Sequence, residues 1–379
     1  MSNIAMAINE AFLNQLLKPE YFQGEKEVAS VVVRYQAEHP PYFELPADDH
    51  PRQNFVIMLD ALTISVHRKD KQIHQATFSL QLNGSFRFEH QQIDIVFDQA
   101  NVRGGGRVAR NLLNMYLNRA VIPAIKEQIV LPDLSQLVGF EVNIDSVQTH
   151  HRMLFITMHV TGDHDDDVPN VIITHTNQPS IFLSATGGAI TASQRGLVIK
   201  QGIDEDTNFP LPMGISFGTV RFHLVGYVAL SQLKIDIQQS VPICSVDYTA
   251  SAGIRVKFTH MGTLNLALSP TITPPAISLN LQTDRAGTRL LAAVQVNSHA
   301  IIGWRIPFIP APVRLLTDEL MSWVDACMGM VIDAVDTGLR TVRIPIFSLD
   351  TLENTLGCTL HFKTVQFRGN SVVVHVIAS

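Results

Sequence analysis

The sequence has 379 residues, of which 46% are hydrophobic and only 16% charged, and its formal net charge is -6. A chain of this length exceeds the roughly 250 to 300 residues at which a single core stops growing, so we expect two domains. The basic residues are scattered along the chain, which argues against a nucleic-acid-binding surface. No stretch reaches the roughly 18 uninterrupted apolar residues that a membrane-spanning helix needs.

The N-terminal segment predicts an amphipathic helix that ends near Leu17, before Pro19. Its apolar residues recur every four positions, at Ile4, Ile8, Phe12 and Leu16. Polar residues interrupt this pattern and no basic leader precedes it, which argues against a signal peptide. The three cysteines are widely separated, at Cys244, Cys327 and Cys358. We therefore expect a reducing, cytoplasmic location, or export without a classical signal peptide.

Alternating apolar and polar residues predict antiparallel strands over 54–67, 76–89 and 93–98. A helix is then expected from about Arg107 to Gln128, with a kink at Pro123. One stripe of this helix contains Val108, Leu112, Tyr116 and Ala120. The second half of the chain returns to the strand pattern over 218–237, 253–258, 264–269 and 276–283.

A third helix is predicted from Val313 to about Leu339, and it has no polar interruption on its main stripe. The apolar stripe contains Val313, Leu316, Leu320, Trp323, Cys327, Val331 and Val335. Met321, Met328, Met330 and Ile332 lie outside that stripe, so the apolar surface is wider than one packing contact requires. Methionine adapts to more than one shape, and the helix is therefore either a wide core helix or one that lines a ligand.

The end of each half of the chain has a similar pattern. Ser146, Val147 and Gln148 match Thr364, Val365 and Gln366, and 154–156 match 372–374 at the same offset in residue number. Upstream of each match the order is helix, then Leu-Pro or Ile-Pro, then a polar loop that is longer in the second half. The N-terminal helix has no counterpart in this comparison. We predict an α+β fold of two similar domains in tandem, 1–165 and 170–379.

This order of strands, long amphipathic helix and closing strands resembles the tubular lipid-binding superfamily, which includes bactericidal/permeability-increasing protein, plasma lipid-transfer proteins and accessory proteins of bacterial toxin gene clusters. The resemblance covers nearly the whole chain and rests on order and pattern. It implies a curved antiparallel sheet wrapped on a long helix in each domain, with acyl chains between the two. Secreted members carry a leader peptide and a disulfide, and this chain shows neither.

Two hypotheses for function follow, and neither requires catalysis or a cofactor. In the first, the chain binds a lipid or other long apolar ligand in a groove, with a protein partner and transient membrane contact left open. The expected ligand-binding residues are Leu112, Tyr116, Leu316, Leu320, Trp323, Cys327, Met328 and Val331. In the second, it is a structural or toxin-complex interaction protein whose domains are solidly packed.

Four other motifs lack the context that their chemistry needs. Three glycines stand before the second helix with Arg103, Arg107 and Arg110 nearby, but without a P-loop lysine, so we expect a turn. Ser216 fits the G-x-S-x-G pattern without a strand before it or a helix after it.

The remaining two motifs suggest metal ligands. Asp163, Asp165 and Asp167 open like a calcium loop but lack its later glycine and glutamate, so we expect a linker ending at Pro169. His150 and His151 are neighbours on a strand and should face opposite ways. No metal site is therefore predicted.

Overall fold

The computed structural model describes residues 2–28, 30–69, 71–89, 92–103, 116–129, 131, 133–161, 168–171, 176–210, 219–259, 262–309 and 311–379. The chain forms two compact units. Unit 1 comprises Met1–Ala189, Thr283–Leu290 and Pro345–Ser379, and unit 2 comprises Ile190–Gln282 and Leu291–Ile344. The end of the chain thus returns to unit 1. The two repeated domains, 1–165 and 170–379, stay a prediction.

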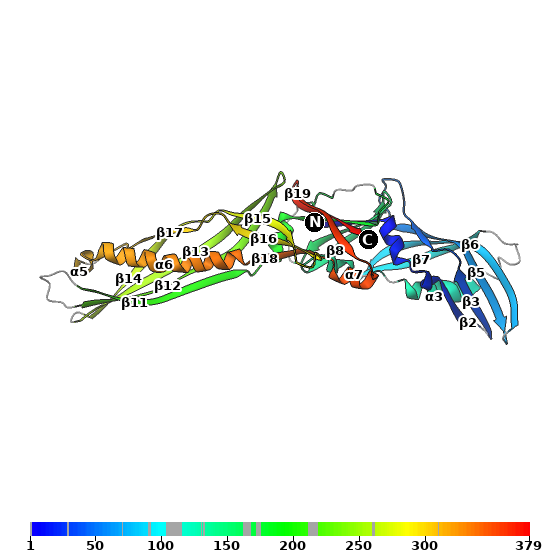
Figure 1. The fold of residues 1–379 in the computed structure, drawn as a ribbon, viewed down its shortest axis with the longest axis horizontal. Coiled ribbons are helices and arrows are strands. Elements are labelled where there is room, and N and C mark those ends of the chain that lie inside the picture. Colours follow the sequence, from blue (N-terminus) through cyan, green and yellow to red (C-terminus); the bar gives the residue numbers. More distant parts are fainter. Residues whose placement is uncertain are drawn as a thin grey trace. The chain divides into compact units, whose positions relative to one another are not determined.

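Antiparallel strands dominate the fold, which fits the α+β class (Figure 1). The first half contains β1 Ile4–Asn9, α1 Glu10–Leu16, η1 Pro19–Phe22, β2 Gln23–Val28, β3 Val31–Ala37, β4 Tyr42–Glu44, β5 Asn54–Arg68, β6 Lys71–Glu89, β7 Gln92–Arg103, η2 Leu117–Val121, α3 Ile122–Gln128, η3 Leu134–Leu137, β8 Val142–His150 and β9 Met153–Val160. The second contains β10 Ser180–Thr186, α4 Gly187–Ser193, β11 Val198–Pro210, β12 Thr219–Gln238, β13 Val241–Phe258, β14 Gly262–Thr273, β15 Ile277–Thr283, β16 Arg289–Val296, β17 Ile301–Arg305, α5 Ala311–Arg314, α6 Thr317–Arg340, β18 Arg343–Ser348, α7 Asp350–Leu356, β19 Leu360–Arg368 and β20 Ser371–Ala378. Within the described residues, no helix is long and apolar enough to cross a membrane.

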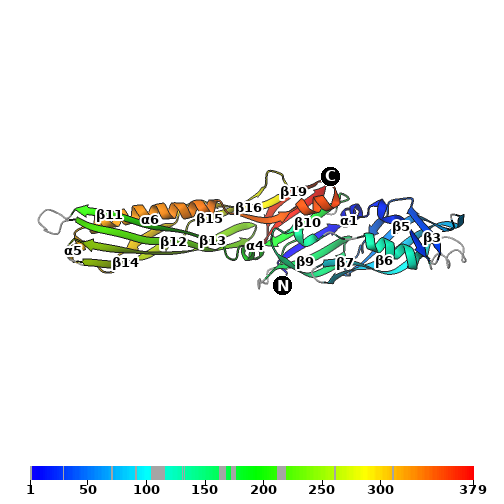
Figure 2. The ribbon, with the colours of Figure 1, turned by 90° about the horizontal axis from the view of Figure 1, so that it is seen from below.

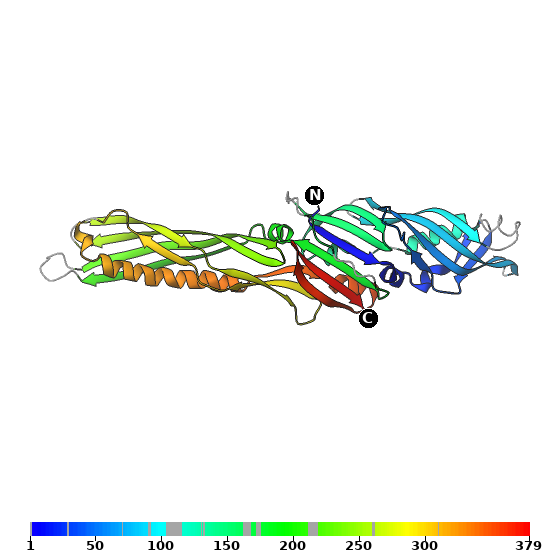
Figure 3. The ribbon, with the colours of Figure 1, turned by 90° about the horizontal axis from the view of Figure 1, so that it is seen from above.

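Unit 1 contains a six-stranded sheet in the order β19-β20-β10-β1-β9-β8, visible in Figure 3 as red, green, blue and teal strands. Its second sheet has the order β2-β3-β5-β6-β7, with β4 paired to β5. Aromatic rings fill the core of this second sheet, where Phe55 contacts Phe43, Phe86 and Phe97 at centroid distances of 4.7 to 6.0 Å. The third sheet, most of whose strands lie in unit 2, has the order β11-β12-β13-β15-β16-β18, and β14 pairs with β13 and β17.

The predicted N-terminal helix is wrong in its first half. Ile4–Asn9 is a strand between β9 and β10, and only Glu10–Leu16 is helical. All six residues of β1 are buried, because both faces of this central strand are covered. A short apolar run does not distinguish a buried strand from a buried helix, which is why the four-residue spacing misled the prediction.

The two closing hairpins have the same register. Val142 pairs with Val160, and Leu360 pairs with Ala378, which is the same pair moved by the offset that relates Ser146 to Thr364. The pairing shifts by one residue between Ile144 and Ser146, and again at the equivalent place between Phe362 and Thr364. The offset predicted from the sequence therefore extends to the strand pairing of both hairpins.

The strands β1 and β10 are related in a similar way, so the N-terminal segment does have a counterpart. They pair symmetrically about Met6 and Leu183, and each continues directly into a seven-residue helix. Asn9 Oδ1 accepts a hydrogen bond from the amide three residues later, and Thr186 Oγ1 does the same. Such side-chain caps stabilise the start of a helix. The sequence comparison missed this relation because it matched only the closing strands.

Both predicted long helices are modified. The third is broken at Leu315 and Leu316 into α5 and the 24-residue α6. In the second, Val108 and Leu112 lie outside the described residues, and the described part begins at Tyr116. A π-helical turn, with Ile122 N donating to Leu117 O, precedes Pro123. Since proline cannot donate to the turn before it, a widened turn relieves the local clash.

Candidate functional site

Helix α6 carries most of the residues predicted to line a ligand groove, and Figure 2 shows it running along the strands of unit 2. It packs against β11, β12 and β17. Five predicted residues have exposed fractions of 0 to 5%: Leu316, Leu320, Cys327, Met328 and Val331. We call the layer between α6 and these strands the interior of unit 2. Its walls on α6 are apolar from Leu316 to Val335.

The sequence pattern placed Trp323 on the main apolar stripe of the helix. In the structure it does not lie at the centre of the buried face. It is half-buried, whereas Val324 and Leu320 are fully buried. Neighbouring helix residues are rotated by about 100° from each other, so a face centred on Leu320 and Val324 leaves Trp323 at its margin. Trp304 of β17 is the tryptophan that lies inside, with 8% of its surface exposed.

The indole of Trp304 has an unmet hydrogen-bonding requirement. Its Nε1 is buried and has no hydrogen-bond partner in the described part of the chain. Burial of a donor without an acceptor is costly, and native structures rarely contain one. On the neighbouring strand, the residue opposite Trp304 is Pro270 of β14. The interior of unit 2 therefore holds one donor that an oxygen atom of a bound molecule would satisfy.

The C-terminal half of α6 contributes a buried carboxyl group, Asp336, which is 1% exposed. Its Oδ1 accepts a hydrogen bond from Tyr248 Oη at 2.8 Å, and its Oδ2 lies 3.0 Å from His299 Nδ1. The amide of Ala300 also donates to Oδ2, at 3.4 Å. Burial, followed by the hydrogen bond and the charge of Asp336, raises the pKa of Tyr248 well above its usual range. These contacts fix α6 to β13 and to the segment that precedes β17.

A close backbone approach fixes the same end of the helix. A Cβ atom at Gly338 would lie 2.9 Å from Cγ2 of Ile199 on β11. Contacts this short are essentially unknown for real Cβ atoms, so glycine sets the separation between α6 and β11. Burial, and then the nearby Glu205, raise the pKa of the Cys327 thiol on α6, which disfavours the reactive thiolate.

The corresponding helix of unit 1 is described only in part. Tyr116 is half-buried, while Leu117, Ala120 and Ile125 are at most 1% exposed. The π turn contacts β2, and α3 contacts β7 and η1. The predicted ligand residue Leu112 lies outside the described residues, so the structure brings together the six predicted residues on and just before α6 and leaves Tyr116 in the other unit.

The other sequence motifs lie partly outside the described residues. Ser216, the aspartates at 163, 165 and 167, and the arginines at 107 and 110 lie outside the described residues. Arg103 donates a hydrogen bond to Gln81 on the adjacent strand. His150 stacks on Phe155 at 3.9 Å, and burial lowers its pKa. Among the described residues, no three His, Cys, Asp or Glu side chains converge as metal ligands.

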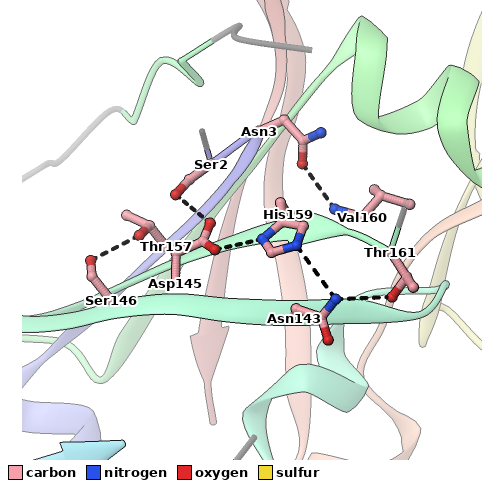
Figure 4. Close-up of polar contacts among 9 residues, drawn as sticks. All are labelled: Ser2, Asn3, Asn143, Asp145, Ser146, Thr157, His159, Val160 and Thr161. Atoms are coloured by element: carbon pink, nitrogen blue, oxygen red, sulfur yellow. Dashed lines mark hydrogen bonds and ion pairs between the residues drawn. The ribbon is translucent and has the colours of Figure 1, made fainter. Parts of the chain in front are cut away.

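A polar network on β8 and β9 contains a serine, a histidine and an aspartate without the geometry of a catalytic triad (Figure 4). Asp145 accepts a hydrogen bond from Ser2 and contacts Nδ1 of His159, so both groups meet the carboxylate. The other nitrogen of His159 faces Asn143 at 3.4 Å. Because the serine hydroxyl donates to the carboxylate and not to the imidazole, the three groups are not in the serine–histidine–aspartate order of a triad. The network ties the N-terminus to the hairpin.

Sequence reasoning missed the polar groups of the interior. Asp336 follows Ile332 and Val335 on the apolar face, and a carboxyl group at such a position is a detectable signal for a buried partner. The partners Tyr248 and His299 are supplied by other elements, and the strand alternation gives no sign of their convergence.

The fold and the interior define a class: an α+β protein in which a long helix packs its apolar face on antiparallel strands. No family model and no curated protein sequence matches the chain. The solved structures that resemble it include the following three. The P47 protein of Clostridium botulinum A2 has 8% identity, with 100% of this chain and 97% of that chain covered and a TM-score of 0.38.

The P47 protein of Clostridium botulinum E1 has 10% identity, with 100% of this chain and 99% of that chain covered and a TM-score of 0.42. A lipopolysaccharide binding protein has 12% identity, with coverage of 100% and 99% and a TM-score of 0.30.

Proposed function

We propose that the chain is a non-enzymatic member of the tubular lipid-binding superfamily and that it binds a lipid or other long apolar molecule in the interior of unit 2. The observation that carries this proposal is the unpartnered donor of Trp304 in a layer that is mostly apolar, since the polar groups of Asp336 already have partners. A hydrocarbon chain would fit the walls, and an ester, hydroxyl or carboxyl oxygen along it would accept the indole hydrogen bond.

The shared register supports the tandem arrangement that this class requires. The hairpins β8–β9 and β19–β20 carry the same pairing and the same one-residue shift, at one constant offset in residue number. They flank β1 and β10, which pair symmetrically and both lead into capped helices. Two copies of one domain, each giving its first and last strands to a common sheet, account for all of these relations.

One observation favours the second hypothesis, a packed interaction protein. Leu320, Val324, Met328 and Val335 are completely buried by the protein's own side chains. In a ligand-binding protein these contacts must open to admit the chain. Methionine suits that movement because it repacks at low cost, and Met328 lies in the middle of the face.

The proposal is tested by extracting the purified protein with organic solvent and identifying bound molecules by mass spectrometry. Titration with a cis-unsaturated fatty acid then follows the emission of Trp304 in a Trp323→Phe background. We expect extracted lipid and a saturable emission change. The matched Trp304→Phe protein reports only on Trp323, whose indole lies at the margin, and should respond less. Absence of extracted lipid together with an unresponsive Trp304 would favour the interaction protein.

For location we propose a reducing compartment, or export without a classical signal peptide. The support is that Cys244, Cys327 and Cys358 are all free thiols. Disulfides are typical of small secreted domains, whereas intracellular proteins keep their cysteines reduced.

A further inference from the structure

Unit 1 contains a polar pocket of about 410 Å³ that no part of the proposed lipid-binding role explains. Its walls include Glu10 and Asn14 of α1, His151, Arg152 and Met153 at the turn between β8 and β9, and Thr176. Pockets of roughly 300 to 1,000 Å³ are the usual size for small-molecule sites. The walls are supplied by three separate segments of the chain, so the fold, and not one loop, shapes this space.

The turn is held firmly. His151 and Arg152 have φ angles of 50° and 58°, in the left-handed region that glycine and asparagine favour. The amides of His151 and Arg152 donate to the carbonyls of Asp48 and Pro46, and Arg152 O accepts from Glu10 N. The same conformation occurs at Gln239 in another hairpin, so backbone strain alone does not mark a site. The evidence for a site here is that the side chains of His151 and Arg152 line the pocket.

The second closing hairpin has different residues at the equivalent turn. The residues that correspond to His151 and Arg152, by the register that the two hairpins share, are Gly369 and Asn370. The bond from Glu10 N to Arg152 O recurs as Gly187 N to Asn370 O, at 3.2 Å. Two glycines and an asparagine thus replace Glu10, His151 and Arg152 while this backbone hydrogen bond is retained. A two-residue turn at this place therefore forms without the larger side chains.

In the second hairpin the corresponding space is filled by the chain itself. Asn170 Nδ2 donates to Asn370 Oδ1, and Asn370 Nδ2 donates to Val168 O. A Cβ atom at Gly369 would collide with the amide of Asn170. Asn170 therefore requires glycine opposite it. At the first hairpin the backbone of Asp48 and Pro46 supports the turn, and the pocket remains beside the longer side chains.

The pocket is lined by two groups of opposite charge, the Glu10 carboxylate and the Arg152 guanidinium, which do not pair with each other. Glu10 Oε2 accepts one hydrogen bond, from Leu45 N. The Arg152 guanidinium is exposed and makes no hydrogen bond or ion pair within the described part of the chain. Both groups line the same space without pairing with each other. A simple anion would meet the carboxylate as well as the guanidinium, whereas a zwitterion satisfies both.

We propose that this pocket binds a small zwitterion, with its carboxylate or phosphate at Arg152 and its ammonium group at Glu10. His151 and the side-chain amide of Asn14 flank the anionic group as hydrogen-bond donors. The same chemistry is found in a free amino acid and in a phosphoethanolamine headgroup. The site lies wholly within unit 1 and is independent of the proposed lipid-binding interior of unit 2.

The test is isothermal titration calorimetry with O-phosphoethanolamine, L-glutamine and inorganic phosphate as separate probes. At least one zwitterion should bind saturably, and phosphate should bind at least about tenfold more weakly. Arg152→Asn and Glu10→Gln should each weaken zwitterion binding by about 10- to 100-fold, since each removes one charge-assisted hydrogen bond. His151→Gly should weaken binding less and should not lower the melting temperature.

Arg152→Asn and His151→Gly are designed to fold, because the second hairpin has asparagine and glycine at the same positions. Gln239→Asn is the matched control, since Gln239 has a φ of 49° in a turn far from the pocket in sequence. It should leave the affinity unchanged. Failure of both zwitterions to bind, or equal affinity of the wild type and Arg152→Asn, would overturn the proposal.

Vesicles distinguish the two sources of the ligand. Cosedimentation with phosphatidylethanolamine vesicles that Arg152→Asn abolishes indicates a lipid headgroup. L-glutamine binding without vesicle binding indicates a free amino acid. The fatty-acid response of Trp304 serves as an internal control, because a protein that loses zwitterion binding but retains that response separates this site from the proposed lipid site.

Discussion

The hydroxyl of Tyr248 lies 2.8 Å from Oδ1 of Asp336, and this hydrogen bond joins the middle of β13 to the buried face of α6. Asp336 is 1% exposed and lies among apolar side chains. A buried polar group is tolerated only when its hydrogen bonds are made, so the position of α6 on the sheet depends on this contact.

We predict that Tyr248→Phe lowers the free energy of unfolding by about 1 to 3 kcal/mol, because Asp336 loses one of its donors. Urea denaturation measures the change. A double-mutant cycle with Asp336→Leu isolates the pair, since leucine has no acceptor and Tyr248→Phe should then cost much less. Equal costs in both backgrounds would show that the hydrogen bond contributes nothing.

The same pair predicts how stability depends on pH. The pKa of Tyr248 is raised in the folded protein, mainly by burial and then by Asp336. The unfolded chain therefore releases this proton first as the pH rises above the ordinary value of 10.0. Stability from this residue is complete below pH 10 and decreases above it.

Tyr248→Phe should remove that decrease. Between pH 10 and 11 the wild type should lose up to about 1.4 kcal/mol per pH unit more than the variant. Stability curves of the two proteins that stay parallel through this range would contradict the assignment.

The position of Leu320 and Trp323 on α6 predicts different losses in the free energy of unfolding when each side chain is truncated to alanine. Leu320→Ala should cost about 2 to 5 kcal/mol, as expected when a fully buried leucine is truncated. Trp323→Ala should cost less than Leu320→Ala, although tryptophan is larger, because its side chain is only half-buried. Chemical denaturation of both variants checks the order, and a greater loss for Trp323→Ala would place that indole in the core after all.

Two glycines in strands predict opposite results for the same substitution. A Cβ atom at Gly84 would lie 2.5 Å from the ring of Phe55 and 2.7 Å from Val96 O, so Gly84→Ala should cost about 1 to 3 kcal/mol. Gly303 has nothing within 4 Å of its Cβ position. Gly303→Ala should therefore be neutral or slightly stabilising. Melting temperatures compare the two, and a stable Gly84→Ala protein would show that Phe55 can move aside.

Burial raises the pKa of the Cys244 thiol to about 11, against an ordinary value of 9.0. At pH 8 the reactive thiolate is then about 100-fold less abundant than in an unperturbed thiol. We predict that iodoacetamide modifies Cys244 about 100-fold more slowly in the folded protein than in denaturant. Peptide mass spectrometry over time gives both rates, and similar rates would mean that Cys244 is accessible.

The sequence could predict the features that repeat along the chain. Alternation indicated the strands, and the offset that relates Ser146 to Thr364 matches the register of both closing hairpins, including the shift after Ile144. These signals are local, since each strand face and each turn leaves its own pattern. The break at Leu315 and Leu316 was missed because the apolar spacing continues through it.

The groups that would do chemistry were harder to predict. Ile4 and Ile8 fit a helix until β9 and β10 are placed on either side of them. Glu10 and Arg152 are far apart in the sequence, and a hydrogen bond between their backbones brings them together. Contacts between residues that are distant in the sequence depend on the tertiary structure, and a local sequence pattern does not reveal them.

The one-residue shifts in the two hairpins have a consequence for solubility. They leave Asp145 and Lys363 as the extra residues in β8 and β19, which are the two outermost strands of the six-stranded sheet of unit 1. An outermost strand has free backbone groups that can recruit a strand from another molecule. An extra, charged residue interrupts the regular row of these groups and bends the strand. The bulges therefore disfavour intermolecular strand pairing, and so aggregation, at both edge strands of the sheet.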